Sequence, residues 1–155
     1  MIGQKRRILF VCTGNTCRSP MAEYYFNSAF GIRSSELKEM TAESCGLAAE
    51  NGSNMSANAK KVLASHNITN DIENIRHESR QINEDIVKDA DIIYGITSHH
   101  EARLKEDFPE FKEKILCMPE NISDPYGGSP EVYERCFENI KKSVDIIIKS
   151  LTEEN

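Results

Sequence analysis

The sequence has 155 residues, of which 39% are hydrophobic and 28% charged, a balance typical of one globular domain with one core. Its net charge of −6 argues against nucleic-acid binding, and no apolar run approaches the ~20 residues that a membrane-spanning helix needs. We therefore expect a single domain over residues 1–155 that binds neither nucleic acid nor membrane.

The first two predicted elements are a strand and a helix joined by a short polar loop. Residues 8–12 form a continuous apolar run, which is typical of a strand buried on both faces of a sheet. After the loop, a helix is predicted from about Arg18, with Pro20 tolerated in its first turn. The apolar residues of this helix fall on one stripe, which comprises Met21, Ala22, Tyr25, Phe26, Ala29 and Phe30.

The rest of the chain alternates predicted strands with predicted helices. Further strands are predicted over residues 40–45, 91–96 and 114–118. Further helices are predicted to begin at Ser56, at Thr97 or Ser98, and at about Pro130. The second of these helices is predicted to end at Pro109, and the third has a core-facing seam that reaches Leu151. This alternation predicts an α/β fold: a three-layer sandwich with a central four-stranded parallel sheet flanked by helices.

The segment after the first strand carries the strongest chemical signal. It reads Cys-Thr-Gly-Asn-Thr-Cys-Arg-Ser-Pro from Cys12 to Pro20, so that five residues separate the first cysteine from the arginine. A short loop between a strand and a helix N-terminus can turn several backbone N–H groups toward one centre, and such a nest binds a tetrahedral oxyanion. Gly14 permits a close approach, and Asn15 tolerates left-handed backbone and can hydrogen-bond its loop neighbours.

Three side chains complete this chemistry. Arg18 offers a planar fork to two phosphate oxygens, and its charge together with the helix dipole favours the thiolate form of Cys12. Ser19 is placed to donate a hydrogen bond to that thiolate. The alternative is a structural cysteine that lies beside an arginine by chance, which the flanking strand and helix patterns disfavour. We therefore predict a site for phosphate or other oxyanions with a thiolate nucleophile.

Three segments beyond the loop bear on the family: Ser44–Gly46, His77–Gln81 and Asp124–Tyr126. Together with Cys-x-Gly-Asn-x-Cys-Arg-Ser-Pro and the Met-Ala-Glu that follows it, they resemble the markers of the low-molecular-weight protein-tyrosine-phosphatase family over nearly the whole chain. The resemblance implies a phosphatase of phosphorylated proteins in which Cys12 is the nucleophile, Arg18 the phosphate clamp and Asp124 the general acid.

The implied role of Asp124 is chemically consistent. A carboxylic acid can protonate the leaving group, and the resulting carboxylate can then activate water against a phosphocysteine. The alternative for Asp124 is a turn residue, since Asp-Pro followed by Gly-Gly is typical of turns. We expect phosphate and substrate to be bound by Thr13, Gly14, Asn15, Thr16, Cys17, Ser19 and Tyr126.

Two departures from the tyrosine-specific pattern bear on the substrate. Thr16 stands where those members typically carry a larger aliphatic residue, and Gly127 stands where many carry a second aromatic residue after Tyr126. Both features resemble the bacterial protein-arginine phosphatases of the family, and Glu50 falls where an aromatic pocket wall is often placed. A cationic guanidinium accepts hydroxyl and carboxylate neighbours, whereas a phenyl ring favours apolar walls. We predict phosphoarginine as the substrate, with phosphotyrosine as the alternative and neutral drift as the other explanation of Thr16.

The five cysteines are odd in number and scattered, which indicates a reducing compartment. A signal peptide is not expected, since its cleavage would remove the segment around Cys12, and the sequence predicts a cytoplasmic protein. For Cys17, the resemblance implies a reversible disulfide with Cys12, and a small hydrophobe that supports the loop is the alternative. Three cysteines are expected in the core, namely Cys45, Cys117 and Cys136.

No cofactor or metal is expected, because the two loop cysteines lack a second ligand pair and His99 and His100 are adjacent. We expect His66 to lie in the core and His77 to support the hydrogen bonds of Asn15. Two other functions are open to a chain with such an anion loop, namely an arsenate reductase and a phosphate-binding module. An arsenate reductase needs resolving cysteines near the third strand, and residues 76–97 contain none. A phosphate-binding module needs neither a nucleophile nor an acid, yet both are present.

Overall fold

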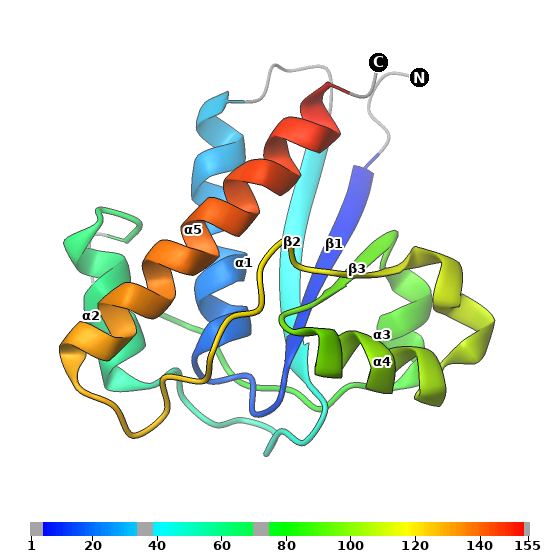
Figure 1. Cartoon of the computed structure of the whole chain (residues 1–155), viewed down its shortest axis with the longest axis horizontal. Helices are drawn as coiled ribbons and strands as arrows, with labels where there is room; N and C mark the ends of the chain where they lie inside the picture. The colour runs from blue at the N-terminus through cyan, green and yellow to red at the C-terminus, as the bar shows by residue number, and fades with distance from the viewer. Residues whose placement is uncertain (1–4, 34–38, 70–74, 154–155) are drawn as a thin grey trace.

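The computed structural model describes residues 5–33, 39–69 and 75–153, and it has helices on both faces of one sheet (Figure 1). The four strands are parallel and lie in the order β2-β1-β3-β4. Their bounds are Lys5–Cys12 for β1, Glu39–Gly46 for β2, Ile92–Gly95 for β3 and Ile115–Cys117 for β4. The predicted three-layer fold is confirmed. The strands β1 and β2 extend beyond the predicted residues, and β3 and β4 are shorter than predicted.

The predicted helices begin where the sequence places them. The bounds are Arg18–Arg33 for α1, Ala57–Ser65 for α2, Glu84–Asp89 for α3, Ser98–Asp107 for α4 and Pro130–Thr152 for α5. Ser56 and Thr97 each accept a hydrogen bond from the first turn of the helix that follows, as predicted. Pro109 follows the end of α4, as predicted, but it begins a short 3-10 helix, Pro109–Lys114.

Helix α3 was not predicted, and its size explains why. It has six residues, of which only Val87 is buried, so the sequence contains no apolar periodicity that would indicate a helix. Its N-cap is Asn83, whose side chain accepts a hydrogen bond from the backbone N–H of Ile86. A single cap residue without a periodic pattern does not identify a helix.

The sheet divides the core into two clusters. Ile8 and Phe10 of β1 face α1, α2 and α5, whereas Leu9 and Val11 face α3 and α4. All four side chains are at most 2% exposed, which accounts for the continuous apolar run of this strand. The stripe of α1 is buried as predicted from Met21 to Ala29, and the side chain of Phe30 lies outside the described residues. The seam of α5 is also buried as predicted, at Tyr133, Phe137, Ile140, Val144, Ile147 and Leu151.

The carboxyl ends of β1 and β2 place the loop that follows Cys12. Gly46, at the end of β2, lies directly against this loop, because a Cβ there would be 2.4 Å from the Thr13 carbonyl oxygen. The backbone N–H groups of Leu47 and Ala48 each donate at 2.9 Å to a loop carbonyl, of Cys12 and Thr13 respectively. The carbonyl oxygens of the loop thus accept hydrogen bonds from the segment after β2. The backbone N–H groups of the loop are left for a bound anion. In the described part of the chain, no helix is both long and apolar enough to span a bilayer.

Candidate active site

A pocket of about 190 Å³ opens at the carboxyl edge of the sheet. It is lined by the seven loop residues from Cys12 to Arg18 and, from a distant segment, by Asp124 and Tyr126. Cys12 is only 3% exposed, yet it belongs to the pocket lining. The structure therefore brings the predicted nucleophile, clamp and acid to one pocket. Glu50 is exposed and does not belong to the pocket lining.

Asn15 holds the loop in its curled shape. Its φ of 59° is in the left-handed region, as the sequence predicts for this residue. Its fully buried side chain donates to the hydroxyls of Ser19 at 2.8 Å and Ser44 at 2.9 Å. Its Oδ1 accepts from the backbone N–H of Arg80 at 3.0 Å. These bonds tie the loop to α1, to β2 and to the segment before α3.

The hydroxyl of Ser19 lies next to the sulfur of Cys12. Ser19 Oγ lies 2.9 Å from Cys12 Sγ, and the carbonyl oxygen of Cys45 is a longer hydrogen-bond acceptor at 3.4 Å. The Asn15 amide donates to the same Ser19 oxygen, which leaves the Ser19 proton available to the sulfur. A thiolate has no proton, so Ser19 would be the donor of this contact in a nucleophilic attack by Cys12.

Arg18 is anchored at the mouth of the loop by the segment that carries Asp124. Its guanidinium Nη1 donates to the carbonyl oxygen of Ile122 at 2.9 Å, and its Nη2 lies 3.8 Å from Asp124 Oδ2. The side chain of Arg18 is 8% exposed and that of Asp124 is 55% exposed. Five N–H donors in a rigid fork leave Arg18 several for a phosphoryl group. Asp124 is held in turn by the backbone N–H of Tyr126, which donates to its Oδ1 at 3.1 Å.

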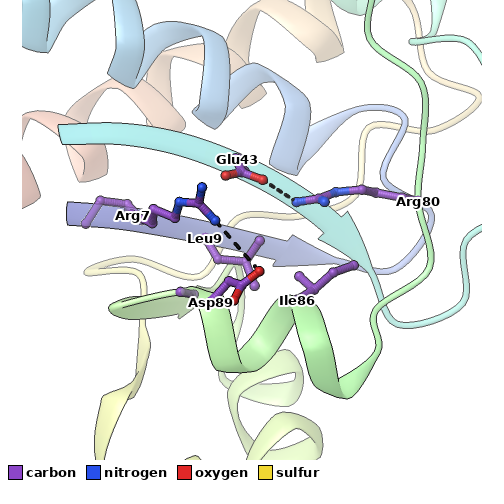
Figure 2. Close-up of a pocket in the computed structure, with 8 residues that line it drawn as sticks. Arg7, Leu9, Glu43, Arg80, Ile86 and Asp89 are labelled. Atoms are coloured by element: carbon purple, nitrogen blue, oxygen red, sulfur yellow. Dashed lines mark hydrogen bonds and ion pairs between the residues drawn. The ribbon is translucent and has the colours of Figure 1, made fainter. Parts of the chain in front are cut away.

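Behind the loop lies a set of partly buried polar groups. His77 Nε2 is 2.8 Å from the carbonyl oxygen of Asn15, which can only accept, so this nitrogen carries a proton. The predicted support of Asn15 by His77 is therefore confirmed. Arg80 is oriented by Glu43, whose Oε1 lies 2.8 Å from the guanidinium. Figure 2 draws this ion pair beside β2.

Glu23 is a member of this set to which no role was assigned from the sequence. Its Oε1 accepts from the Ser44 hydroxyl at 2.6 Å and lies 4.0 Å from His77 Nδ1. Burial raises the pKa of Glu23 to about 7, despite the opposing hydrogen bond from Ser44. Burial also lowers the pKa of His77. The sequence offers only the position of Glu23 in the Met-Ala-Glu that follows the loop.

The cysteines differ in their surroundings, and all five are free thiols. Burial raises the pKa values of Cys45 and Cys136 to about 12, which is consistent with the predicted core positions. Cys117 is only half-buried at the end of β4, so its predicted core position is wrong. Cys17 Sγ lies 3.3 Å from the hydroxyl of Tyr133, whose pKa is raised to about 12 by burial and by this hydrogen bond. A disulfide between Cys17 and Cys12 remains a prediction.

His66 lies at the surface edge of the core instead of inside it, because it follows the last turn of α2 where the apolar face ends. Its side chain is 27% exposed, and its ring packs on Phe137 at 4.6 Å between centroids. Its Nε2 lies 2.6 Å from Glu134 and 3.8 Å from Glu138. In the described residues, these three groups are close enough to hold a metal ion, with ligand atoms within 4.8 Å. The short hydrogen bond to Glu134 accounts for the arrangement without one.

The comparison with protein families decides the assignment of this chain. Residues 7–155 match the family model described as low molecular weight phosphotyrosine protein phosphatase. This chain belongs to that family. A cysteine-dependent hydrolysis of phosphorylated proteins is therefore its class of reaction.

Relatives within the family carry two kinds of name. A protein-arginine-phosphatase of Geobacillus stearothermophilus is 34% identical over an alignment that covers 96% of this chain and 97% of the relative. A low-molecular-weight protein tyrosine phosphatase from T. tengcongensis has a structure that superposes with a TM-score of 0.84, at 34% identity and over 94% of this chain and 99% of the other.

A third structure is similar in fold and bears on the chemistry. It is a cysteine-to-serine mutant of the YwlE arginine phosphatase with a phosphorylated active-site serine. Its TM-score is 0.86 at 25% identity, over 96% of this chain and 97% of the other. The family is thus settled by sequence and fold together, and the substrate is a separate question.

Proposed function

We propose that this protein hydrolyses phosphoarginine on proteins through a phosphocysteine intermediate, with Cys12 as nucleophile. The thiolate attacks phosphorus, so that the S–P bond forms while the P–N bond breaks. Asp124 gives its proton to the departing guanidino nitrogen, and Arg18 with the loop N–H groups binds the phosphoryl oxygens. Water then attacks phosphorus, Asp124 takes its proton, the S–P bond breaks and phosphate leaves. The Ser19 contact at 2.9 Å stabilises the sulfur as it becomes anionic again.

The observation that carries this proposal is the polar wall of the pocket next to the nucleophile. Thr16 lines the pocket with Cys12, and its hydroxyl lies 3.7 Å from Cys17 Sγ, a weak partner that leaves the oxygen open to substrate. A hydroxyl at this place suits a planar cation with N–H donors more than a phenyl ring. The name of the Geobacillus relative supports the same substrate, and the phosphorylated serine of the YwlE mutant supports attack by the residue at position 12.

Phosphotyrosine is the second candidate, and Tyr126 does not discriminate between the two substrates. Its side chain lines the pocket, and the residue is 77% exposed, so it can stack on a phenyl ring as well as on a guanidinium. The name of the T. tengcongensis phosphatase supports this candidate. The five free thiols support action in a reducing compartment, which we propose to be the cytoplasm.

The test compares two substrates for the parent and for Thr16→Ile. We expect a higher kcat/KM on a phosphoarginine protein than on a phosphotyrosine peptide, and we expect Thr16→Ile to reverse or abolish that preference. Cys12→Ser is the control for the mechanism and should abolish steady-state turnover of both substrates. A parent that prefers phosphotyrosine, with a Thr16→Ile variant that behaves identically, contradicts the phosphoarginine assignment.

A further inference from the structure

The Thr13 hydroxyl has a buried partner outside the loop. Thr13 lines the pocket with Cys12 and Asp124, and its Oγ1 lies 3.0 Å from His100 Nε2. His100 is 2% exposed and belongs to the first turn of α4. This helix follows β3, which is the neighbour of β1 in the sheet, so its first turn lies beside the loop that follows β1. The proposed mechanism makes no use of His100.

The hydrogen bonds of His100 determine which ring nitrogen carries its proton. Nδ1 accepts from the backbone N–H of Thr97 at 3.1 Å and lies 2.9 Å from the Thr97 hydroxyl. A nitrogen that accepts from an N–H has no proton of its own, so in the neutral ring the proton is on Nε2. Burial, helped by the nearby charge of Arg18, lowers the pKa of His100 to about 4, so the ring is neutral near pH 7. His100 Nε2 therefore donates to Thr13 Oγ1.

This donation defines what the Thr13 hydroxyl offers to a bound molecule. A hydroxyl has one proton and two lone pairs, and His100 occupies one lone pair of Thr13 Oγ1. The oxygen keeps its second lone pair and its proton, and Thr13 is exposed at the pocket. A guanidinium has N–H donors for that lone pair, whereas a phenyl ring has only C–H groups.

We propose that Thr13, positioned by His100, is a specificity-determining residue whose hydroxyl oxygen accepts an N–H of the phosphoguanidinium leaving group. This inference rests on the proposed phosphoarginine function and deepens it. His100 is a positioning residue here, because it acts through Thr13 and not on the substrate. A hydrogen bond from a charged donor corresponds to about 10- to 100-fold in kcat/KM, and this selectivity is absent for an aryl phosphate.

The first test removes only the hydroxyl. Thr13→Val is nearly isosteric and lacks the oxygen, whereas Thr13→Ser keeps it. For each variant, kcat and KM are measured on a phosphoarginine protein and on a phosphotyrosine peptide. We expect Thr13→Val to lower the ratio of the two kcat/KM values at least ~10-fold, mainly by raising KM for phosphoarginine, because the contact exists before the chemical step. Thr13→Ser should stay within ~3-fold of the parent, since it keeps the charge-assisted bond. An unchanged ratio in Thr13→Val overturns the proposal.

The second test separates positioning from mere packing. His100→Phe removes the N–H donor, and His100→Gln retains one at a similar reach. We expect the Phe variant to lower the ratio as Thr13→Val does, and the Gln variant to recover most of it. The double variant Thr13→Val/His100→Phe should be no less selective than Thr13→Val alone, whereas additive losses overturn the positioning role. His100→Phe also removes the bond that His100 Nδ1 accepts in the α4 capping box, although the N-cap Thr97 remains. If this variant fails to fold, the Thr13 variants and His100→Gln still decide the question.

The substrate preference of the parent enzyme shows whether the proposed function fails or only the role of Thr13. A parent that prefers phosphotyrosine overturns both the proposed function and this inference. A parent that prefers phosphoarginine, together with a Thr13→Val variant that keeps the preference, overturns only the role of Thr13 and leaves the proposed function intact.

Discussion

The partly buried carboxyl of Glu23 should make stability depend on pH in a way that one substitution removes. Glu23 lies behind the phosphate loop, where burial raises its pKa from the usual 4.5 to about 7. A group whose pKa is raised by folding contributes stability that is fully present below its unfolded pKa and is lost as pH rises through its folded pKa. The contribution of Glu23 should therefore be lost between about pH 4.5 and 7. Glu23→Gln has the same shape, keeps an acceptor for the Ser44 hydroxyl and has no proton to lose.

The expected magnitude follows from the difference between the two pKa values. Folding raises the pKa of Glu23 from 4.5 to about 7, and each pKa unit corresponds to about 1.4 kcal/mol. The free energy of unfolding of Glu23→Gln, relative to that of the parent, should therefore rise by about 3 kcal/mol between pH 4.5 and 8. Burial lowers the pKa of His77, so the stability that His77 contributes is lost as pH falls. This effect is opposite in direction to that of Glu23. His77 is present in both proteins, so most of its effect cancels in the comparison.

Urea unfolding followed by circular dichroism at several pH values measures this difference. Glu110→Gln is the matched control, because Glu110 is exposed on the 3-10 helix far along the chain from the loop, and its curve should parallel that of the parent. The deciding quantity is the difference in free energy of unfolding between Glu23→Gln and the parent. If this difference stays constant within ~0.5 kcal/mol from pH 4.5 to 8, the raised pKa of Glu23 is refuted.

Three further predictions concern the acid, the loop and the core. Asp124→Asn should lower kcat by about 10²–10⁴ on a poor leaving group and by less on p-nitrophenyl phosphate, and equal losses on both would argue against proton donation. Asn15→Ala should reduce the free energy of unfolding by about 2–4 kcal/mol in urea titrations, because it leaves buried partners unpaired and places alanine at a φ of 59°. Phe26 is fully buried, and its ring centroid lies 6.1 Å from that of Phe10. Phe26→Ala should therefore reduce the free energy of unfolding by about 3–5 kcal/mol in the same assay, and a loss below ~1 kcal/mol would contradict its place in the core.

The loop from Cys12 to Arg18 was predictable because its geometry is local. A buried strand, a loop of fixed length and a helix with proline in its first turn are each visible in a short stretch of sequence, from residue 8 to Pro20. A short connection of this kind, with glycine and asparagine inside it, favours a curled loop whose N–H groups converge. The left-handed Asn15 follows from the same local requirement.

Local sequence patterns could not predict which distant residues contact this loop. Ser44, Arg80 and His77 meet Asn15 only because β2 lies beside β1, and the backbone of residues 77–80 then passes close behind the loop. Asp124 was assigned a role through family resemblance, since a turn was the other explanation of its segment. Its proximity to Arg18, at 3.8 Å, depends on the path of the chain between β4 and α5.

The sequence by itself therefore determined the order of the main elements and the curled shape of the loop from Cys12 to Arg18, and it predicted Cys12 as the nucleophile. The tertiary structure decided which groups surround that loop: the carboxyl of Glu23 with its raised pKa behind it, the Ile122 carbonyl on Arg18 and the His100 ring on Thr13. The physical reason is range. Backbone preferences and apolar periodicity act over a few neighbouring residues, whereas burial and hydrogen bonding between distant segments exist only after the strands are ordered in the sheet.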